Sequence, residues 1–415
     1  MHVLLIHQAF AGPGDAGGTR HYELSRYLAA RGHQVTIVAS ELNYLTGTKA
    51  DAVGDALAPG IDIIRVPVRG ALHDSYATRV RSFVSFVAAA TRAALRVADV
   101  DVVWGTTPPL PQLLPAWLAS LRSRGGLVME ERDLWPEFAI GMGLIQDGAL
   151  ARAAMRFKKL MYGRAARVII NSPGFVPFLE SYGVDSAKVR VIPNGVDVGE
   201  FAGGDGSTIR RELGLGDEFV VLYAGALGPA NGLDVVLTAA EQLRDTPAVF
   251  LLVGDGKARA ELMRAADERG LANVRFVAAQ PKARIPSFVA ASDACLATLR
   301  PIPLFRTTYP NKVFDYMAGA RPVLLGIDGV IRDVVDEARA GIFTTPGDAA
   351  ALATAVRHLL GDRGEARAMG ERGRIAVRER FDRGLQGAQL EALFEELLPQ
   401  TRTRPAVMAK AAKVA

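Results

Sequence analysis

Cysteine is almost absent from this sequence of 415 residues, in which Cys295 is the single example. One thiol excludes a framework of disulfides and a zinc site built from several cysteines. The apolar residues around it, 294–297, indicate an inert thiol inside the core. Cysteine chemistry is therefore not expected to contribute to the function.

Long apolar runs are also missing. A helix that spans a bilayer needs ~20 apolar residues, whereas the longest candidate, residues 82–90, is short and is flanked by Arg81 and Arg92. The first residues lack the basic segment and the apolar stretch of a signal peptide. We therefore expect a cytoplasmic protein without a transmembrane helix, which could still sit at the inner face of the plasma membrane.

An excess of charge of one sign is small in this chain. Lys and Arg number 49 against 44 Asp and Glu, which gives a net charge of +5. This balance fits an anionic ligand or an anionic membrane surface. No basic block with interleaved aromatic residues is present, so we expect no nucleic-acid partner. The triplet Asp99-Val100-Asp101 precedes a predicted strand instead of following one, and we expect no metal site.

Short apolar runs alternate with helical patterns along almost the whole chain. This alternation is typical of parallel sheets wrapped by helices, and 49% of hydrophobic residues supplies a large core. The predicted strands are residues 2–7, 34–39, 61–66, 100–104, 126–130, 167–171, 189–192, 219–224, 249–253, 274–277, 294–298, 322–326 and 341–344.

Two halves begin in the same way, with a strand, a glycine-rich loop and a helix. We therefore predict an N-terminal domain over residues 1–200 and a second domain over residues 209–380. The glycine-rich and polar residues 201–208 are predicted to be the linker. A last helix over 381–399 and a basic tail over 400–415 complete the chain.

The glycine loops are candidate phosphate sites. Glycines allow close approach of the backbone, and the free amides at a helix N-terminus attract anions. A plain tight turn is the alternative at each place. The first loop lacks the full G-x-G-x-x-G pattern and no acidic residue ends the next strand, which argues against a nicotinamide cofactor. The candidate donor-binding residues in these loops are Gly17, Gly18, Arg20, Gly225, Gly228, Gly254 and Lys257.

Residues 309–323 carry the most informative pattern. Lys312 and Asp315 are three residues apart, so they share one face of a short helix that Pro310 and Asn311 begin. A lysine suits a diphosphate and a carboxylate suits the diol of a ribose. An ion pair on a surface helix is the alternative.

Taken in order, these segments resemble the retaining glycosyltransferases of family 4, which have the GT-B fold. The most similar branch contains bacterial envelope-polysaccharide enzymes, including fucosaminyl-transferase-like proteins. The resemblance implies two Rossmann-like doubly wound α/β domains that face each other across a cleft, with a C-terminal helix that crosses back to the first domain. Its marks are residues 17–24, 131–137, 192–197, 223–225, 231–233, 253–256 and 312–323.

The resemblance also implies an activity. The enzyme would move a sugar from a nucleotide diphosphate-sugar, with UDP-sugars favoured, to a glycan, lipid-linked or small-molecule acceptor in the synthesis of envelope polysaccharide or glycoconjugates. The reaction would retain the anomeric configuration and would need neither metal nor cofactor. A polyprenyl-diphosphate-linked sugar is one expected acceptor. The amphipathic residues 79–97 and the basic residues Arg152, Arg156, Lys158 and Lys159 suggest contact with an anionic membrane, a core-facing helix with a solvated basic face being the alternative.

Site residues follow from the same resemblance. Asp315 would hold the ribose, whereas Thr307 occupies the place of a second acidic residue, so that backbone amides around 305–308 would replace it. Ala226 and Asn231 occupy the places of two diphosphate-binding cations, and Arg20, Lys257, Arg306 or Lys312 would compensate. The expected catalytic residues are Asp133, Glu137, His21 and Lys312, with a capping aspartate and a structural histidine as alternatives.

Three other functions remain open. A nucleotide-sugar epimerase of the same fold is disfavoured, because no acidic and histidine cluster is evident. A two-lobed, non-catalytic nucleotide- or sugar-binding protein is disfavoured by the lack of a signal peptide. A nicotinamide oxidoreductase is disfavoured because Ala39 and Ser40 end the second strand.

Overall fold

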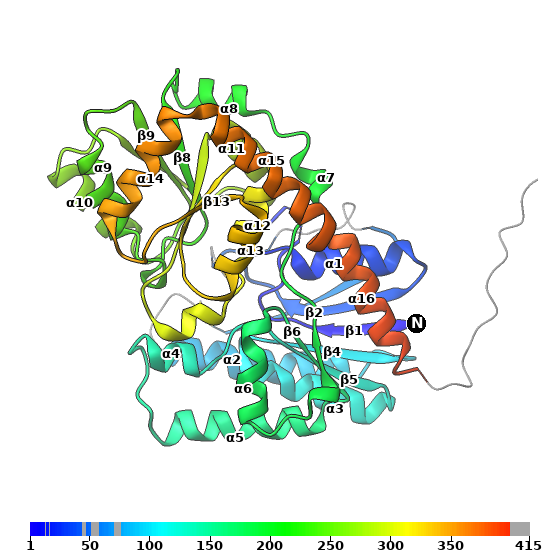
Figure 1. Cartoon of the computed structure of the whole chain (residues 1–415). Coiled ribbons are helices and arrows are strands. Elements are labelled where there is room, and N and C mark those ends of the chain that lie inside the picture. Colours follow the sequence, from blue (N-terminus) through cyan, green and yellow to red (C-terminus); the bar gives the residue numbers. More distant parts are fainter. Residues whose placement is uncertain (13, 16, 44–46, 51–57, 70–75, 399–415) are drawn as a thin grey trace, which may run out of the picture.

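The computed structural model describes residues 1–398 except 13, 16, 44–46, 51–57 and 70–75. It has two lobes, each built on a parallel sheet (Figure 1). Within the described residues, the sheet of the first lobe has seven strands in the order β3-β2-β1-β4-β5-β6-β7. These strands are β1 (His2–Ile6), β2 (Gln34–Ser40), β3 (Ile61–Val66), β4 (Val102–Thr107), β5 (Gly126–Glu131), β6 (Arg167–Ile170) and β7 (Val189–Val191).

Helices cover both faces of this sheet. The apolar side of α1 packs on one face together with the last helix of the chain, and α2 and α3 pack on the other face. The helices and 3-10 turns of the first lobe are α1 (Arg20–Ala30), α2 (Tyr76–Ala94), η1 (Leu110–Gln112), α3 (Leu113–Ser123), α4 (Glu137–Gly141), α5 (Ala149–Arg164), η2 (Pro173–Phe175), α6 (Val176–Ser181) and η3 (Ser186–Lys188).

The second lobe repeats the plan. Its described part has a six-stranded parallel sheet in the order β10-β9-β8-β11-β12-β13. The strands are β8 (Phe219–Ala224), β9 (Ala248–Val253), β10 (Val274–Val277), β11 (Ala294–Thr298), β12 (Val323–Gly326) and β13 (Gly341–Phe343). Around them lie α7 (Val198–Phe201), α8 (Gly206–Glu212), η4 (Pro229–Asn231), α9 (Asp234–Gln242), α10 (Arg259–Glu268), η5 (Lys282–Arg284), α11 (Ile285–Ala291), η6 (Pro303–Thr307), α12 (Asn311–Ala318), α13 (Val330–Ala338), α14 (Ala349–Gly361) and α15 (Arg363–Arg380).

The predicted fold class is confirmed, and the strand order shows where each lobe can bind a ligand. In an open parallel sheet, ligands bind beyond the carboxyl ends of the strands where the order reverses. This reversal lies between β1 and β4 in the first lobe and between β8 and β11 in the second. The glycine loops after β1 and β8 lie at these two places.

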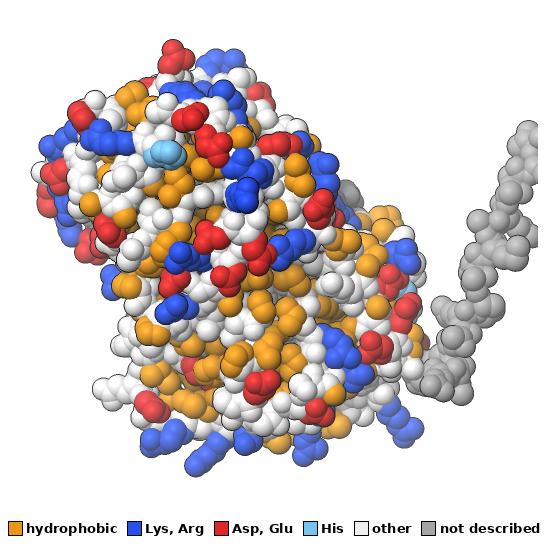
Figure 2. All heavy atoms as spheres, in the orientation of Figure 1, with side chains coloured by type: hydrophobic (Ala, Val, Ile, Leu, Met, Phe, Trp, Pro, Cys, Tyr) orange, Lys and Arg blue, Asp and Glu red, His pale blue; other side chains and the backbone are white. Residues whose placement is uncertain are grey.

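Three helices of the first lobe contain no acidic residue. The helices α2, α3 and α5 contain no Asp or Glu, and α3 packs against both of the others. Lys and Arg side chains gather along the lower edge of the lobe, over α5 (Figure 2). Apolar side chains are exposed between them, including Val84, Leu121 and Leu150. Across the described part of the chain, no helix combines the length and hydropathy needed to cross a bilayer.

The chain crosses between the lobes twice. After β7 it enters the core of the second lobe, where Val196, Val198 and Phe201 are buried. The predicted linker residues, 201–208, lie beyond this point, at the end of α7 and the start of α8, which Asp205 caps. The chain returns after α15, and α16 (Arg383–Glu395) packs on α1, as predicted for the crossover helix.

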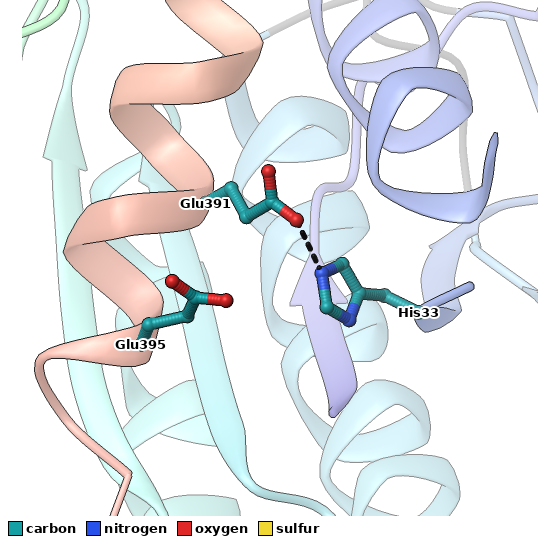
Figure 3. A group of neighbouring side chains, drawn as sticks. All are labelled: His33, Glu391 and Glu395. Atoms are coloured by element: carbon teal, nitrogen blue, oxygen red, sulfur yellow. Dashed lines mark hydrogen bonds and ion pairs between the residues drawn. The ribbon is translucent and has the colours of Figure 1, made fainter. Parts of the chain in front are cut away.

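Charged side chains fasten α16 and the first crossing to α1. The Nε atom of Arg383 lies 2.6 Å from the Glu23 carboxylate, and both side chains are buried. The same guanidinium donates to the carbonyl oxygen of Gly195 at 2.6 Å. Further along α16, Glu391 accepts a hydrogen bond from His33 at 2.8 Å (Figure 3).

The pKa of Glu23 is lowered by the positive charges around its buried carboxylate. Burial alone would raise the pKa, but the positive charges of Arg383 and Lys282 outweigh it and hold the pKa at about 2. The folded protein therefore binds fewer protons on Glu23 than the unfolded chain, whose glutamate pKa is 4.5. This contribution to stability is present above about pH 4.5 and is lost as the pH falls toward about 2.

We expect Glu23→Gln to lower the free energy of unfolding by about 3–5 kcal/mol at pH 7, because it leaves Arg383 buried without its counter-charge. The difference should shrink as the pH falls from 4.5 toward 2. Urea unfolding at several pH values measures it. Asp245→Asn, which breaks the exposed pair with Arg357, is the control and should change stability far less, because solvent screens that pair. Equal effects of the two substitutions would contradict the expectation.

Candidate functional site

A lysine without a counter-charge lies at the ligand-binding edge of the second lobe. Lys312, in the first turn of α12, lies beside the end of β8, where its Nζ atom donates to the Tyr223 hydroxyl at 2.7 Å. The same atom lies 3.9 Å from the centroid of the Tyr223 ring. Among the described residues, no carboxylate forms an ion pair with it. Burial lowers the pKa of Lys312 to about 7, so an anion is the partner that this site lacks.

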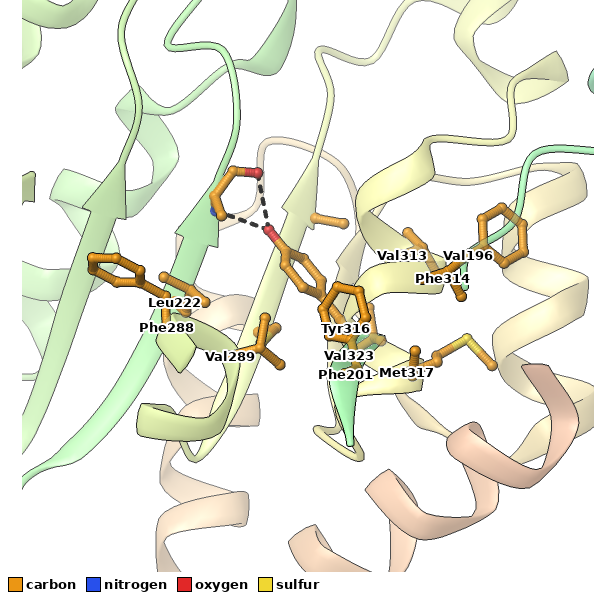
Figure 4. Packing of buried hydrophobic residues seen from close by; sticks show 14 of the residues in the cluster. Val196, Phe201, Leu222, Phe288, Val289, Val313, Phe314, Tyr316, Met317 and Val323 are labelled. Carbon is orange, nitrogen blue, oxygen red and sulfur yellow. Dashed lines mark hydrogen bonds between the residues drawn. The ribbon is translucent and has the colours of Figure 1, made fainter. Parts of the chain in front are cut away.

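Tyr316 fixes the position of this lysine. Its ring is buried in the core of the second lobe, and its hydroxyl accepts from the Ala224 amide at 2.9 Å (Figure 4). This contact joins the middle of α12 to the last residue of β8, one turn of helix away from Lys312.

Two predicted glycines lie next to each other at the same place. Gly225 and Gly254 have φ values of 147° and 152°, which strongly favour glycine. A Cβ atom on Gly254 would lie 1.8 Å from the carbonyl oxygen of Gly225, and one on Gly225 would lie 3.2 Å from Nζ of Lys312. The structure therefore brings Lys312, Gly225 and Gly254 together. Gly228 lies further along the first loop, and Lys257 is exposed in the second turn.

Asp315 does not pair with Lys312, its neighbour three residues earlier on the helix. Its carboxylate accepts from Lys282 of η5 at 2.7 Å. Lys312 and Asp315 therefore form no ion pair with each other, and the surface-pair alternative is wrong. Asn311 is exposed at the start of the helix.

The turn η6 carries two other predicted donor-binding residues. Arg306 is 62% exposed and pairs with Asp328 at 3.0 Å. The Thr307 hydroxyl donates to the Leu304 carbonyl at 2.7 Å. The Phe305 and Thr308 amides donate to Ile302 and Phe305, so these two amides are not free to replace the missing carboxylate.

The same turn docks on the first lobe. The Ser172 hydroxyl donates to the Thr307 carbonyl at 2.5 Å, and the Phe305 ring lies 5.5 Å from the Phe138 ring of α4. A Cβ atom on Gly174 would lie 2.5 Å from the Thr307 carbonyl oxygen, so only glycine permits this approach. The contacts join η6 to the segment that follows β5, through Phe138, and to the segment that follows β6, through Ser172 and Gly174.

Arg20 and His21 are placed away from Lys312. The buried Arg20 guanidinium pairs with Glu130 at 3.0 Å and donates to the Ile192 and Pro193 carbonyls. It therefore holds the first crossing to the first lobe. The buried His21 ring donates to Glu130 at 2.6 Å, and burial lowers its pKa to about 4 against the opposing pull of Glu130. Gly17 and Gly18 precede α1, and space is open next to the Gly18 Cα atom.

Asp133 and Glu137 flank a short segment after β5 but differ in their surroundings. Asp133 is open to solvent, yet enough protein surrounds it that loss of water raises its pKa. In the described part of the chain its carboxylate has no hydrogen bond or ion pair. Glu137 instead accepts from Tyr182 and pairs with the buried Lys158 at 3.0 Å. Of the two, only Asp133 has free oxygen atoms.

Sequence patterns missed several polar residues at the β1–β4 switch point. Arg132 donates to His7 at 3.1 Å and to the Thr107 carbonyl at 2.9 Å. Buried polar atoms of Gln8 and Thr106 have no hydrogen-bond partner. Their place directly after predicted strands was the available signal, although a lone polar residue at a strand end is weak on its own.

Metal-binding groups lie at the opposite edge of the first sheet. In the described part, the group of side chains that could share an ion is His33, Glu391 and Glu395. His33 precedes β2, at the amino edge of the sheet, and Arg31 already pairs with Glu391 at 2.9 Å. Asp101, also at that edge, accepts from the His2 amide at 2.8 Å. Neither group faces Lys312.

Two family models match most of the chain. The one described as "Glycosyl transferase 4-like domain" matches residues 16–195, within the first lobe and its crossing. The one described as "Glycosyl transferases group 1" matches residues 218–362, within the second lobe.

Curated relatives and solved structures agree with these matches. The colanic acid biosynthesis glycosyl transferase WcaI of Escherichia coli K12 is 27% identical over 287 residues, which are 66% of this chain and 70% of that protein. The D-inositol 3-phosphate glycosyltransferase of Nocardia farcinica is 28% identical over 392 residues, 89% of this chain and 83% of that protein. The structure of Anabaena HepE in complex with UDP-glucose has the same fold, with a TM-score of 0.73, 22% identity, and coverage of 96% of this chain and 100% of that chain.

The free Lys312 ammonium predicts how anion binding depends on pH. We expect inorganic pyrophosphate to bind about tenfold more weakly at pH 8 than at pH 6, because a lysine with a pKa of about 7 loses most of its charge over this range. Isothermal titration measures the affinity. Lys312→Arg is the matched control, since its guanidinium keeps its charge and should flatten the dependence. A wild-type affinity that does not change with pH would contradict this role.

Proposed function

Because the chain belongs to the glycosyltransferases of the family 4 type, with the GT-B fold, we propose that it transfers a sugar from a nucleotide diphosphate-sugar to an acceptor hydroxyl, with retention of the anomeric configuration. The observation that carries the proposal is the uncompensated Lys312 ammonium beside the glycine turns at the end of β8. A diphosphate supplies the missing negative charge.

The leaving group explains why this charge matters. As the bond between sugar and phosphate stretches, negative charge grows on the diphosphate, and a preorganised cation stabilises it without rearrangement. In our proposal Lys312 does this beside the Gly225 and Gly254 turns, where the absence of side chains lets a diphosphate approach the backbone. Asp315 lies three residues further along α12, paired with Lys282 of η5, and there we place the ribose.

The first lobe supplies the acceptor side of the proposed reaction. Asp133 has free carboxylate oxygens, and η6 docks close to the segment that carries it. We assign Asp133 to orienting the acceptor hydroxyl, while the leaving phosphate takes its proton. The reaction then needs no metal, and His21 and Glu137 support the site from within the lobe.

Donor and acceptor are proposed from the relatives. HepE binds UDP-glucose, which supports a UDP-sugar donor. WcaI is named for colanic acid biosynthesis, which supports a role in polysaccharide synthesis. As acceptor we propose a polyprenyl-diphosphate-linked sugar. The surface of α2, α3 and α5, basic and free of acidic residues, supports peripheral contact with an anionic membrane.

A panel of UDP-, GDP-, ADP- and dTDP-sugars tests the donor. We expect a UDP-sugar at ~100 times its dissociation constant to stabilise the protein by ~2.7 kcal/mol in thermal-shift measurements. Lys312→Ala should weaken donor binding by about 10- to 100-fold, because it removes a charge-assisted contact. Lys312→Arg should retain most of the affinity.

Product analysis separates the proposal from its rivals. NMR of the product should show the same anomeric configuration as the donor. Equal donor affinity in Lys312→Ala and wild type would count against the assigned site, and conversion of the donor without any acceptor would favour an epimerase.

Flotation with liposomes tests the membrane contact. We expect the protein to float with vesicles rich in anionic lipid and to stay behind with neutral vesicles. Each basic residue near an anionic surface contributes about 1 kcal/mol, so charge reversal at Arg152, Arg156 and Lys159 together should abolish flotation. The same reversal at Arg211, Arg264 and Arg367, which are exposed on the second lobe, is the control and should have no effect. If the variant with reversed charges at Arg152, Arg156 and Lys159 still floats with anionic vesicles, the proposed membrane contact is wrong.

A further inference from the structure

A second lysine, Lys158 of α5, is completely buried, with 0% of its side chain exposed. Three oxygen acceptors surround its Nζ atom: the Glu137 carboxylate at 3.0 Å, the Trp135 carbonyl at 3.3 Å and the Glu131 carboxylate at 3.5 Å. The rings of Tyr162, Phe178 and Tyr182 lie 5.5–5.9 Å from the same nitrogen. The ammonium is therefore enclosed by protein and has no access to a ligand.

The three acceptors belong to one segment of chain. Glu131 is the last residue of β5, Trp135 lies in the connection, and Glu137 is the first residue of α4. One ammonium therefore joins both ends of the connection that carries Asp133. Two tyrosines complete the arrangement, since Tyr162 donates to Glu131 at 2.7 Å and Tyr182 donates to Glu137.

The clamped segment touches the rest of the candidate site at two further places. Arg132, next to Asp133, reaches the switch point of the first sheet through His7 and the Thr107 carbonyl. On the other side, Phe138 of α4 packs against Phe305 of η6 in the second lobe. A shift of the segment would move Asp133 relative to both.

We propose that Lys158 is a positioning residue for the transfer reaction: it clamps residues 131–137 so that Asp133 is held in place between the two lobes. This inference rests on the proposed function and assigns Lys158 no contact with substrate. Lys158 balances two buried carboxylates at once, and without it Glu131 and Glu137 would repel each other across the ends of the connection.

The clamp has a consequence that separates it from donor binding. The donor site around Lys312 lies in the second lobe, and none of the contacts of Lys158 reaches it. Loss of the clamp should therefore affect the turnover number and leave the donor dissociation constant unchanged. A displacement of a reacting group by about 1 Å costs on the order of 100-fold in rate.

Lys158→Met tests the clamp, with Lys49→Met as the matched change at an exposed position. We expect kcat to fall by about 10- to 100-fold with the nucleotide-sugar affinity unchanged, and Lys158→Arg to restore part of the rate. Hydrogen exchange of the 131–141 amides should accelerate in Lys158→Met and remain as in wild type in Lys49→Met.

Tyr182→Phe provides a milder change for the case in which Lys158→Met does not fold. It removes only the hydroxyl that donates a hydrogen bond to Glu137. It should lower kcat and accelerate hydrogen exchange, as Lys158→Met does, but by a smaller factor. Unchanged exchange of residues 131–141 in the folded variant would overturn the clamp, and so would an unchanged kcat. A wild-type protein without transfer activity on the donor panel would instead overturn the proposed function, while the exchange measurement still decides whether Lys158 holds the segment.

Discussion

The Lys312 ammonium, held at the carboxyl edge of the second sheet without a carboxylate, is the interaction from which the proposed chemistry follows. A buried cation is costly unless a negative charge compensates it. Among the residues that the structure describes, no carboxylate supplies the compensation, since Asp315 on the same helix pairs with Lys282 instead. Tyr316 prevents the lysine from moving away, because it fastens α12 to the last residue of β8. The structure thus keeps a cation where a diphosphate would complete the pairing.

The contacts between the lobes fix where Lys312 lies relative to the first lobe. Within the described part of the chain, the lobes are joined by the first crossing, by the return into α16 and by the docked turn η6. Arg20 and Arg383 hold the crossings to α1 through carbonyl oxygens and the carboxylates of Glu130 and Glu23. The η6 contacts are different, because they pair aromatic rings and a backbone carbonyl with α4 and η2. The crossings are thus held by buried charges, whereas η6 meets the first lobe through aromatic rings and a backbone carbonyl.

Sequence patterns were sufficient for the sheets and for part of the site. Strands of parallel sheets are buried on both faces, so they appear as short apolar runs, and each predicted run corresponds to a strand. Lys312 could be predicted from the sequence, because a cation lies at the start of a predicted helix, in the segment that carries the most informative pattern. Arg20 met the same description, yet its guanidinium binds carbonyls of Ile192 and Pro193, far away in the sequence. A local sequence pattern shows which side chains can donate a hydrogen bond, but not which residue far away in the sequence accepts it. For the same reason the pairing of Lys282 with Asp315 and the docking of η6 could not be predicted.

Lys158, which is fully buried, and Lys312, which is partly buried, show how charge balance distinguishes a structural lysine from a ligand-binding one. Lys158 has two carboxylates, a carbonyl oxygen and three aromatic rings around it, so a substrate could add nothing to its coordination. Lys312 has a tyrosine hydroxyl and a distant amide oxygen, and neither carries charge. Each is a lysine on a helix, Lys158 in the middle of α5 and Lys312 in the first turn of α12. The number of opposite charges around each ammonium distinguishes them. Lys158 connects parts of the protein to one another, whereas Lys312 is left to bind an anion from solution.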